Sequence, residues 1–361
     1  MLAPWFRAEE IGGNPSYAFH TTAGREVVLL FFGSTSEERA AAALREVTAR
    51  RSVFDDVRLC FFGISIDPRD VATGRLAAQT PGIRFFLDRD RAISMAYGAT
   101  PATPSDPTRL PYHAHWLLLD RMLRVVAVAS LDQGAALLDL AQARAVAPQV
   151  EVPAPALIVE RVFEPELCRQ LIVQYEAHGG QESGFMREEN GRTVERHDLH
   201  HKIRRDHEVD DQTLCRALSA RIHDRLVPMI ARAFQFHATR MERYIVACYD
   251  SAEGGHFRAH RDNTTKGTAH RRFAVTINLN AGNYDGGDLC FPEFGERQYR
   301  APTGGAIVFS CSLLHQAQPV TRGKRYAFLP FLYDDAAAAI RTVNQSFIGD
   351  GILSLDDATR H

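Results

Sequence analysis

The sequence lacks closely spaced cysteines. No two of the six cysteines in this 361-residue chain form a Cys-x-x-Cys pair, and they stand far apart at positions 60, 168, 215, 248, 290 and 311. This spacing excludes a zinc knuckle and gives no sign of a disulfide framework. A reducing compartment is therefore the natural expectation.

An excess of charge and a long apolar run are also missing. The formal net charge is −2 and the pI is about 6.7, so composition does not favour nucleic acid or an anionic membrane surface as a partner. No apolar stretch approaches the roughly 20 residues that span a bilayer. Residues 1–15 have neither the basic start nor the apolar core of a secretory leader. We expect a cytoplasmic protein.

Through the first 147 residues, apolar runs alternate with helix-forming segments. Strands are predicted at 25–33, 57–67 and 83–88, helices at 36–51, 70–80 and 132–147, and a closing hairpin at 115–129. Continuous apolar strands between helices indicate an α/β sheet that is covered on both faces.

A change of composition follows this segment. Three prolines lie within the eight residues 148–155, directly after an Ala/Leu-rich stretch. The length is also more than one ordinary domain requires. We therefore predict two domains, over residues 1–148 and 149–361.

In the second half, His260-Arg261-Asp262 is the informative triplet. On a strand, side chains at i and i+2 project from one face, so His260 and Asp262 can reach one point together. A histidine from another strand, His315, would complete two imidazoles and one carboxylate. That ligand set suits Fe(II) and leaves coordination positions open.

The residues downstream of the triplet strengthen this interpretation. Strands separated by Gly-rich turns are predicted between 271 and 334, and one of them delivers His315. Arg325 follows ten residues later, one hairpin away. A guanidinium can bind a carboxylate through two hydrogen bonds but does not bind a metal. The pattern indicates a site for an acidic cosubstrate beside the metal.

Residues 241–334 resemble the catalytic double-stranded β-helix (jelly-roll, cupin-like) of 2-oxoglutarate- and Fe(II)-dependent dioxygenases, specifically the prolyl 4-hydroxylase group. The resemblance rests on the stretches 246–263, 286–294 and 304–328. It implies that His260, Asp262 and His315 bind iron and that Arg325 holds the distal carboxylate of 2-oxoglutarate. It also places Tyr249 near the cosubstrate. Asn278 stands where some relatives have a tyrosine on the cosubstrate carboxylate, so its role is open.

The resemblance implies hydroxylation of an unactivated C–H bond with Fe(II), 2-oxoglutarate, O2 and ascorbate as a reductant, and with release of succinate and CO2. An aspartate at position 262 argues against a halogenase, which needs that ligand position vacant. The expected substrate is a prolyl or other residue of a protein or peptide. A free amino acid or other small metabolite is the alternative, and a non-catalytic sensor or scaffold is a third.

The N-terminal half is similar to the thioredoxin-like fold of the peroxiredoxin (redoxin) family, in the order of its elements and in residues 63–70 and 85–99. It departs from that family where the reactive cysteine would stand, since residues 34–38 read Ser-Thr-Ser-Glu-Glu. Cys60 falls inside an apolar strand, where a thiol is usually inert. We expect a catalytically inactive scaffold for partner or substrate contact, or for a homodimer.

Helices are predicted at 164–180 and 209–234, the second capped by Asp210 or Asp211. The charge-dense segment 186–208 between them is read either as a solvated face or as a loop that covers the substrate. Its histidines 197, 200, 201 and 207 are spaced too irregularly to favour a second metal site. The Ala-rich segment 334–355 could dock on its own domain or on a partner.

Overall fold

The structure is a computed structural model that describes residues 1–101, 111–148 and 151–349. These residues divide into two compact units: unit 1 is Met1–Glu151 with Pro292–Gly295, and unit 2 is Val152–Phe291 with Glu296–His361. The boundary predicted between 148 and 149 falls beside residues 149–150, which lie outside the described residues.

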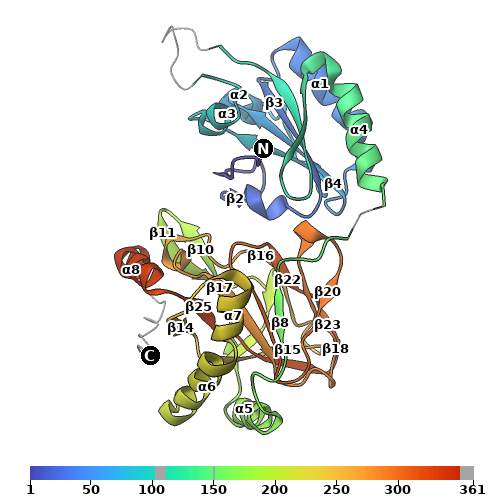
Figure 1. Ribbon diagram of the computed structural model, residues 1–361. Helices are drawn as coiled ribbons and strands as arrows, with labels where there is room; N and C mark the ends of the chain where they lie inside the picture. The colour runs from blue at the N-terminus through green and yellow to red at the C-terminus, as the bar shows by residue number, and fades with distance from the viewer. Residues whose placement is uncertain (102–110, 149–150, 350–361) are drawn as a thin grey trace. The chain divides into compact units, whose positions relative to one another are not determined.

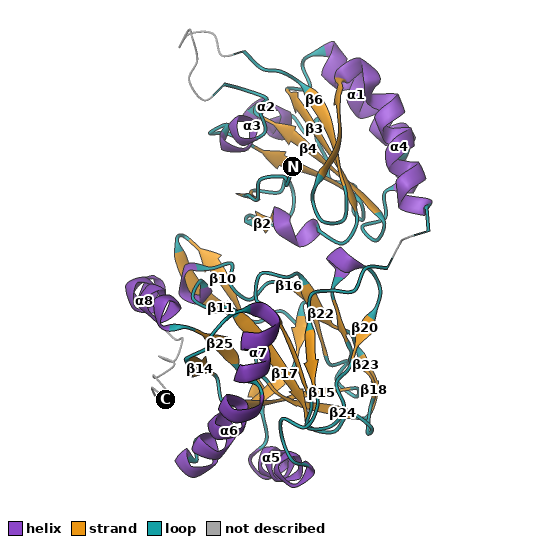
Figure 2. Ribbon diagram, viewed as in Figure 1, coloured by secondary structure: helices purple, strands orange, loops and turns teal. Residues whose placement is uncertain are grey.

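Unit 1 is built around a five-stranded mixed sheet in the order β5-β4-β3-β6-β7 (Figures 1 and 2). The strands are β3 (Glu26–Gly33), β4 (Leu59–Ser65), β5 (Ile83–Leu87), β6 (His115–Leu119) and β7 (Val125–Ser130). The pairs β3–β4 and β4–β5 are parallel, whereas β6 runs antiparallel to β3 and to β7. Every residue of β3 and β4 is buried, as their continuous apolar sequences predict.

Helices complete unit 1, and one of them is shorter than its sequence suggested. They are α1 (Glu38–Ala49), α2 (Pro68–Ala72), α3 (Ala92–Ala96) and α4 (Gly134–Val146), with a short two-stranded sheet of β1 (Arg7–Ala8) and β2 (Tyr17–Ala18). We predicted a helix over 70–80, but α2 ends at Ala72. Gly74, which follows the C-cap Thr73, has φ +67°, a left-handed conformation that stops the helix.

Unit 2 contains a nine-stranded antiparallel sheet along the path β14-β25-β17-β24-β15-β13-β9, with β21 joining β17 to β8. Its strands are β8 (Leu157–Val159), β9 (Gln181–Glu182), β13 (Arg205–Glu208), β14 (Arg240–Glu242), β15 (Ile245–Asp250), β17 (Phe273–Asn278), β21 (Ala306–Ser310), β24 (Lys324–Phe328) and β25 (Phe331–Tyr333). All six residues of β17 are buried, so this strand crosses the middle of the unit.

A second antiparallel sheet of unit 2 has the order β12-β16-β22-β19-β20. Its strands are β12 (Lys202–Ile203), β16 (His256–His260), β19 (Leu289–Cys290), β20 (Gln298–Tyr299) and β22 (His315–Ala317). The strands β18 (Asp285–Gly286) and β23 (Val320–Arg322) form a separate antiparallel pair. Residues of both sheets line one pocket.

Three helices pack against the large sheet through a shared hydrophobic core. They are α5 (Pro165–His178), α6 (Gln212–Arg225) and α7 (Val227–Phe234). We predicted one helix over 209–234, but it divides at Leu226, because Pro228 cannot continue the α6 hydrogen-bond pattern. The cap is Asp211, whose carboxylate accepts from the backbone of Thr213 and Leu214.

The charge-dense segment folds into strands: β10 (Phe185–Glu189) and β11 (Arg192–Arg196) form a hairpin, followed by β12 and β13. The described part of the C-terminal segment docks on its own unit. Its helix α8 (Asp335–Asn344) leads to Ile348, which forms a parallel bridge with Thr193 of the hairpin. Residues 350–355 of the predicted segment lie outside the described residues.

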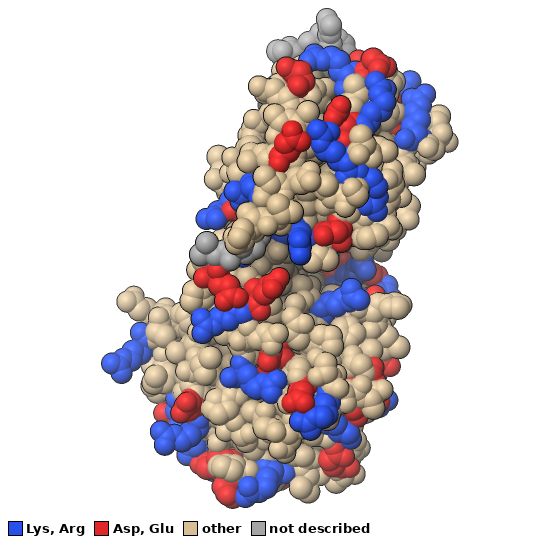
Figure 3. All heavy atoms as spheres, turned by 90° about the vertical axis from the view of Figure 1, so that its right-hand side faces the viewer, with Lys and Arg blue, Asp and Glu red and all other residues tan. Residues whose placement is uncertain are grey.

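Surface charge is mixed. On the face in Figure 3, Lys and Arg side chains alternate with Asp and Glu side chains in both units. Within the described ranges, no helix has the length and apolar character needed to span a bilayer.

Candidate active site

The three predicted metal ligands lie together at one end of the smaller sheet. His260 is the last residue of β16, His315 is the first of β22, and the two are paired across the ladder. Asp262 follows just beyond the end of β16, where its backbone N–H donates to the Cys311 carbonyl over 3.0 Å. One ligand atom from each residue lies within 4.8 Å of the other two.

The rings of both histidines are held by backbone carbonyls two residues back. His260 Nδ1 lies 2.7 Å from the Arg258 oxygen, and His315 Nδ1 lies 3.0 Å from the Leu313 oxygen. Because a carbonyl only accepts, Nδ1 must carry the proton and Nε2 is left with its lone pair. The Nε2 atoms lie 3.5 Å and 3.3 Å from the Asp262 carboxylate. All three donors therefore converge on one point.

The electrostatics suit metal binding. Burial, with the neighbouring His315, lowers the pKa of His260 to about 4, so its imidazole is neutral at pH 7. Burial alone would raise the pKa of Asp262, but a proton on Nε2 of His315 or His260 holds it well below its usual range, so protons and a metal ion compete for the same three donors. Two neutral imidazoles and one carboxylate are the forms that coordinate a divalent cation.

Arg325 and Tyr249 are cross-strand partners on β24 and β15. The guanidinium carbon of Arg325 lies 5.1 Å from the centre of the Tyr249 ring. Arg325 is only 3% exposed, and its Nε and Nη1 are buried without a hydrogen-bond partner. A buried, unpaired guanidinium is costly unless an anion completes it, so these atoms mark a carboxylate site.

Asn278 is not among the residues that line the pocket. Its side-chain amide donates to the Ala301 carbonyl over 2.7 Å and accepts from the Tyr284 hydroxyl over 3.3 Å. On the same face of β17, Thr276 lines the pocket instead. The structure thus brings Arg325 and Tyr249 to the pocket, together with the three predicted metal ligands, but not Asn278.

The pocket has a volume of about 850 Å³ and combines apolar and charged walls. The ring of Phe257 stacks on that of His260 at 3.5 Å between centres. The Lys202 ammonium lies 4.9 Å from the centre of the same Phe257 ring. The Phe257 ring therefore lies between this buried amine and the metal ligand His260, and burial lowers the pKa of the amine well below its usual range.

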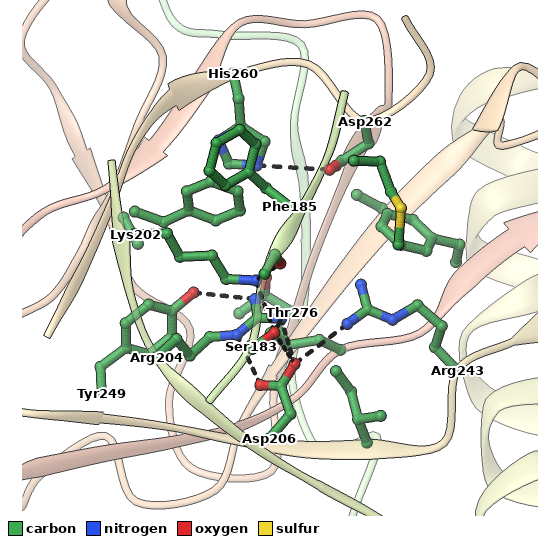
Figure 4. Close-up of a pocket in the computed structure, with 18 of the residues that line it drawn as sticks. Ser183, Phe185, Lys202, Arg204, Asp206, Arg243, Tyr249, His260, Asp262 and Thr276 are labelled. Carbon is green, nitrogen blue, oxygen red and sulfur yellow. Dashed lines mark hydrogen bonds and ion pairs between the residues drawn. The ribbon is translucent and has the colours of Figure 1, made fainter. Parts of the chain in front are cut away.

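Sequence reasoning missed a buried ionic cluster around Asp206 (Figure 4). Arg204 binds the Asp206 carboxylate through both oxygens, at 2.7 Å and 2.6 Å, and Arg243 approaches it at 3.3 Å. The Ser183 hydroxyl donates to the same carboxylate and accepts from the Lys202 ammonium. Burial alone would raise the pKa of Asp206, but the surrounding cations lower it to about 2.

A signal for this cluster is present in the sequence. Lys202, Arg204 and Asp206 alternate at i, i+2 and i+4, the spacing of one face of a strand. The expectation that segment 186–208 is only a solvated face is therefore wrong, since nine of its residues line the pocket. Among the described residues, His260, Asp262 and His315 are the only group of three whose ligand atoms lie close enough together to hold one metal ion, and no histidine of segment 186–208 belongs to such a group.

Comparison with known proteins agrees with this geometry. Residues 244–333 match the model of the 2OG-Fe(II) oxygenase superfamily. This segment contains His260, Asp262, His315, Arg325 and Tyr249, and it is a 2OG-Fe(II) oxygenase domain.

A PKHD-type hydroxylase from Synechococcus sp. (strain JA-2-3B'a(2-13)) is 33% identical over 116 residues, which cover 30% of this chain and 49% of that protein. The chain thus spans about half the length of the curated relatives it matches.

Among solved structures, a prolyl hydroxylase from Trichoplax adhaerens in complex with a hypoxia inducible factor peptide fragment is 17% identical. The match covers 52% of this chain and 86% of that one, with a TM-score of 0.41. Peroxiredoxin Q of Xanthomonas campestris is 18% identical, with 39% of this chain and 91% of that one covered and a TM-score of 0.32.

Proposed function

We propose that unit 2 is an Fe(II)- and 2-oxoglutarate-dependent dioxygenase with a double-stranded β-helix core. It hydroxylates an unactivated C–H bond in a prolyl or other residue of a protein or peptide, with release of succinate and CO2. The observation that carries the proposal is Arg325, whose buried and unpaired nitrogens lie in the same pocket as three converging metal ligands.

Each residue has a defined role in this proposal. His260, Asp262 and His315 hold Fe(II), which supplies the oxidising chemistry when 2-oxoglutarate and O2 are also bound. Arg325 binds the distal carboxylate of 2-oxoglutarate, and the Tyr249 ring supports its guanidinium. The ring of Phe257 covers one face of His260 and keeps water from that side of the site.

A small-molecule substrate is the second candidate, and a specific observation favours it. Lys202, Arg204 and Arg243 put several charges inside a pocket that a peptide backbone, being uncharged, would not need. The pocket would suit a charged amino acid or metabolite as well as a peptide residue.

We also propose that unit 1 is a non-peroxidase scaffold for partner or substrate contact, or for a homodimer, and that the protein acts in the cytoplasm. Cys60 is fully buried in β4, and burial raises the pKa of its thiol to about 12. A thiol in that state is a poor nucleophile.

The experiment is turnover of 2-oxoglutarate by the purified chain with Fe(II) and ascorbate, in the presence of candidate peptides and amino acids. We expect succinate formation that requires added Fe(II) and is lost in His260→Ala and Asp262→Ala. Failure of the Fe(II)-loaded protein to bind 2-oxoglutarate, or succinate formation that survives both substitutions, would contradict the proposal. Omitting ascorbate tests its role as a reductant.

A further inference from the structure

The cations around Asp206 outnumber the carboxylates that neutralise them. Within the described part of the chain, Asp206 is the only carboxylate in hydrogen-bond or ion-pair contact with Lys202, Arg204 or Arg243. Burial lowers the pKa of the Lys202 ammonium well below its usual range, so the charge count rests on the two guanidiniums of Arg204 and Arg243. One carboxylate compensates one of them, so this cluster keeps a net positive charge inside the pocket.

Two of the three cations already have well-placed partners. Arg204 is 5% exposed, and its Nε and Nη2 bind the two Asp206 oxygens. The Lys202 ammonium donates to the Ser183 hydroxyl over 2.7 Å and to the Gly184 carbonyl. The hydrogen bonds of both side chains are already made in their present positions, so we expect neither side chain to rearrange when a ligand binds.

Arg243 is the cation that remains available. Its contact with Asp206 is a single one, at 3.3 Å from Nη2, and 21% of its side chain is exposed to the pocket. In Figure 4 its guanidinium points into the pocket, across from Lys202 and Arg204 and below Asp262. The guanidinium carbon of Arg243 lies 5.5 Å from the centre of the Phe331 ring. A planar fork in this position suits a carboxylate.

The field at Arg243 also favours an anion. Burial and the neighbouring charge of Arg204 lower the pKa of Arg243 to about 10. A cation destabilised by burial and by a like charge is stabilised when an anion binds next to it. Arg325 cannot share that anion, because its own guanidinium is taken by 2-oxoglutarate in the function proposed above. The positive charge of Arg243 is therefore available to bind the substrate.

We propose that the substrate is an amino acid unit with a free carboxylate, which Arg243 binds while Phe257 and Phe331 contact its apolar part. The inference rests on the proposed function, since it assumes that 2-oxoglutarate occupies Arg325. The carboxylate can belong to a free amino acid, to the C-terminal residue of a peptide or to an acidic side chain.

The test is calorimetric titration of the Mn(II)-loaded protein, saturated with 2-oxoglutarate under anaerobic conditions. The probes are free amino acids, N-acetyl amino acids and N-acetyl amino acid amides across the standard side chains. Each amide differs from its acid only in lacking the α-carboxylate. We expect at least one acid to bind about tenfold more tightly than its amide, the effect of one charge-assisted hydrogen-bonded pair. Preference for free, N-acetylated or side-chain acids identifies the source of the carboxylate.

Arg243→Gln should reduce that preference to within about twofold while leaving 2-oxoglutarate affinity unchanged, because Arg325 is intact. Arg205→Gln is the matched control: it removes an arginine of β13 that contacts exposed Glu253 and does not line the pocket. It should retain the full preference. Circular dichroism checks that both variants fold.

The inference is overturned if no acid binds better than its amide, or if folded Arg243→Gln keeps the preference. Should Arg243→Gln fail to fold, the acid-against-amide comparison in the unmodified protein still decides. A preliminary 2-oxoglutarate titration separates the two proposals. Absence of 2-oxoglutarate binding contradicts the proposed function, whereas binding without any acid preference contradicts only the further inference.

Discussion

At the scale of single residues, Arg325 provides the sharpest prediction. Arg325→Gln removes a buried charge and its hydrogen-bonding fork, so 2-oxoglutarate affinity should fall about 100-fold, roughly 3 kcal/mol. Arg325→Lys keeps the charge but not the fork and should lose about tenfold. Titration of 2-oxoglutarate into the Mn(II)-loaded variants measures both.

The control for this series is Arg322→Gln. Arg322 is the last residue of β23, three positions before Arg325, but 67% of its side chain is exposed and it pairs with Asp285 outside the pocket. The affinity of the Arg322→Gln variant for 2-oxoglutarate should equal that of the unmodified protein. Equal losses in the Arg322 and Arg325 variants would argue against a specific carboxylate site.

The buried His201 side chain leads to a prediction of how the free energy of unfolding depends on pH. Burial lowers the pKa of His201 from 6.5 to about 4, between the rings of Phe185 and Phe257. Between pH 6.5 and 4 the unfolded chain therefore binds a proton that the folded chain does not, so stability falls as pH falls through this window. His201→Gln should lose part of this slope in urea unfolding of the metal-free protein. His260 and His207, whose pKa values are also lowered, maintain the rest. An unchanged slope in His201→Gln would show that His201 does not titrate in this way.

At the scale of elements, Thr193 ties the β10–β11 hairpin to the rest of unit 2. Its hydroxyl accepts from the Gly267 N–H over 2.8 Å, and its carbonyl accepts from the Gly349 N–H over 2.9 Å. Thr193→Val keeps the shape but leaves the Gly267 donor unpaired, so the free energy of unfolding should fall by about 1 kcal/mol. Hydrogen exchange should also become faster in the hairpin.

Thr193→Ser keeps the hydroxyl and is the control for this pair. Exchange in its hairpin should stay slow, although loss of the methyl group can lower overall stability. If Thr193→Val and Thr193→Ser exchange at the same rate, the hydroxyl does not hold the hairpin.

How much the sequence predicts depends on how far a pattern extends. The buried strands β3 and β4 are long apolar runs, and their sequence is enough to place them. The alternation of Lys202, Arg204 and Asp206 extends over two short strands, β12 and β13, and inside a charge-dense segment it is interpreted as solvated charge. Arg243 itself has φ +68°, in the short connection between β14 and β15, and no sequence pattern predicts that conformation.

The site shows the same contrast. The convergence of His260, Asp262 and His315 could be predicted, because the chemistry of iron restricts which residues bind it, and their ligand atoms do lie within 4.8 Å of one another. Asn278 could not, because a strand pattern gives the face of a side chain but not its distance from a pocket. Its amide meets Ala301 and Tyr284, two contacts made by distant parts of the chain.

At the scale of the whole molecule, each unit has its own hydrophobic core. Unit 1 packs around residues such as Leu30 and Phe61, and unit 2 around residues such as Leu218 and Phe328. We expect two calorimetric transitions, of which only one shifts upward when Mn(II) and 2-oxoglutarate are added, because ligand binding stabilises the unit that binds.

Leu30→Ala identifies the other transition. The side chain is fully buried in unit 1, so its loss should cost about 2–5 kcal/mol and lower that transition alone. A single transition that responds to both ligand and Leu30→Ala would mean that the two units unfold together.

The carbonyls that hold the two histidine rings belong to Arg258 and Leu313, and each is a main-chain group. Side-chain substitution at these two positions therefore leaves both orienting hydrogen bonds in place. In many metal sites, carboxylate side chains behind the ligands orient the histidine rings. Here the main chain itself orients the two imidazole rings. Most substitutions at positions 258 and 313 should therefore leave metal binding intact. A substitution that shifts the backbone there, such as proline, should abolish metal binding.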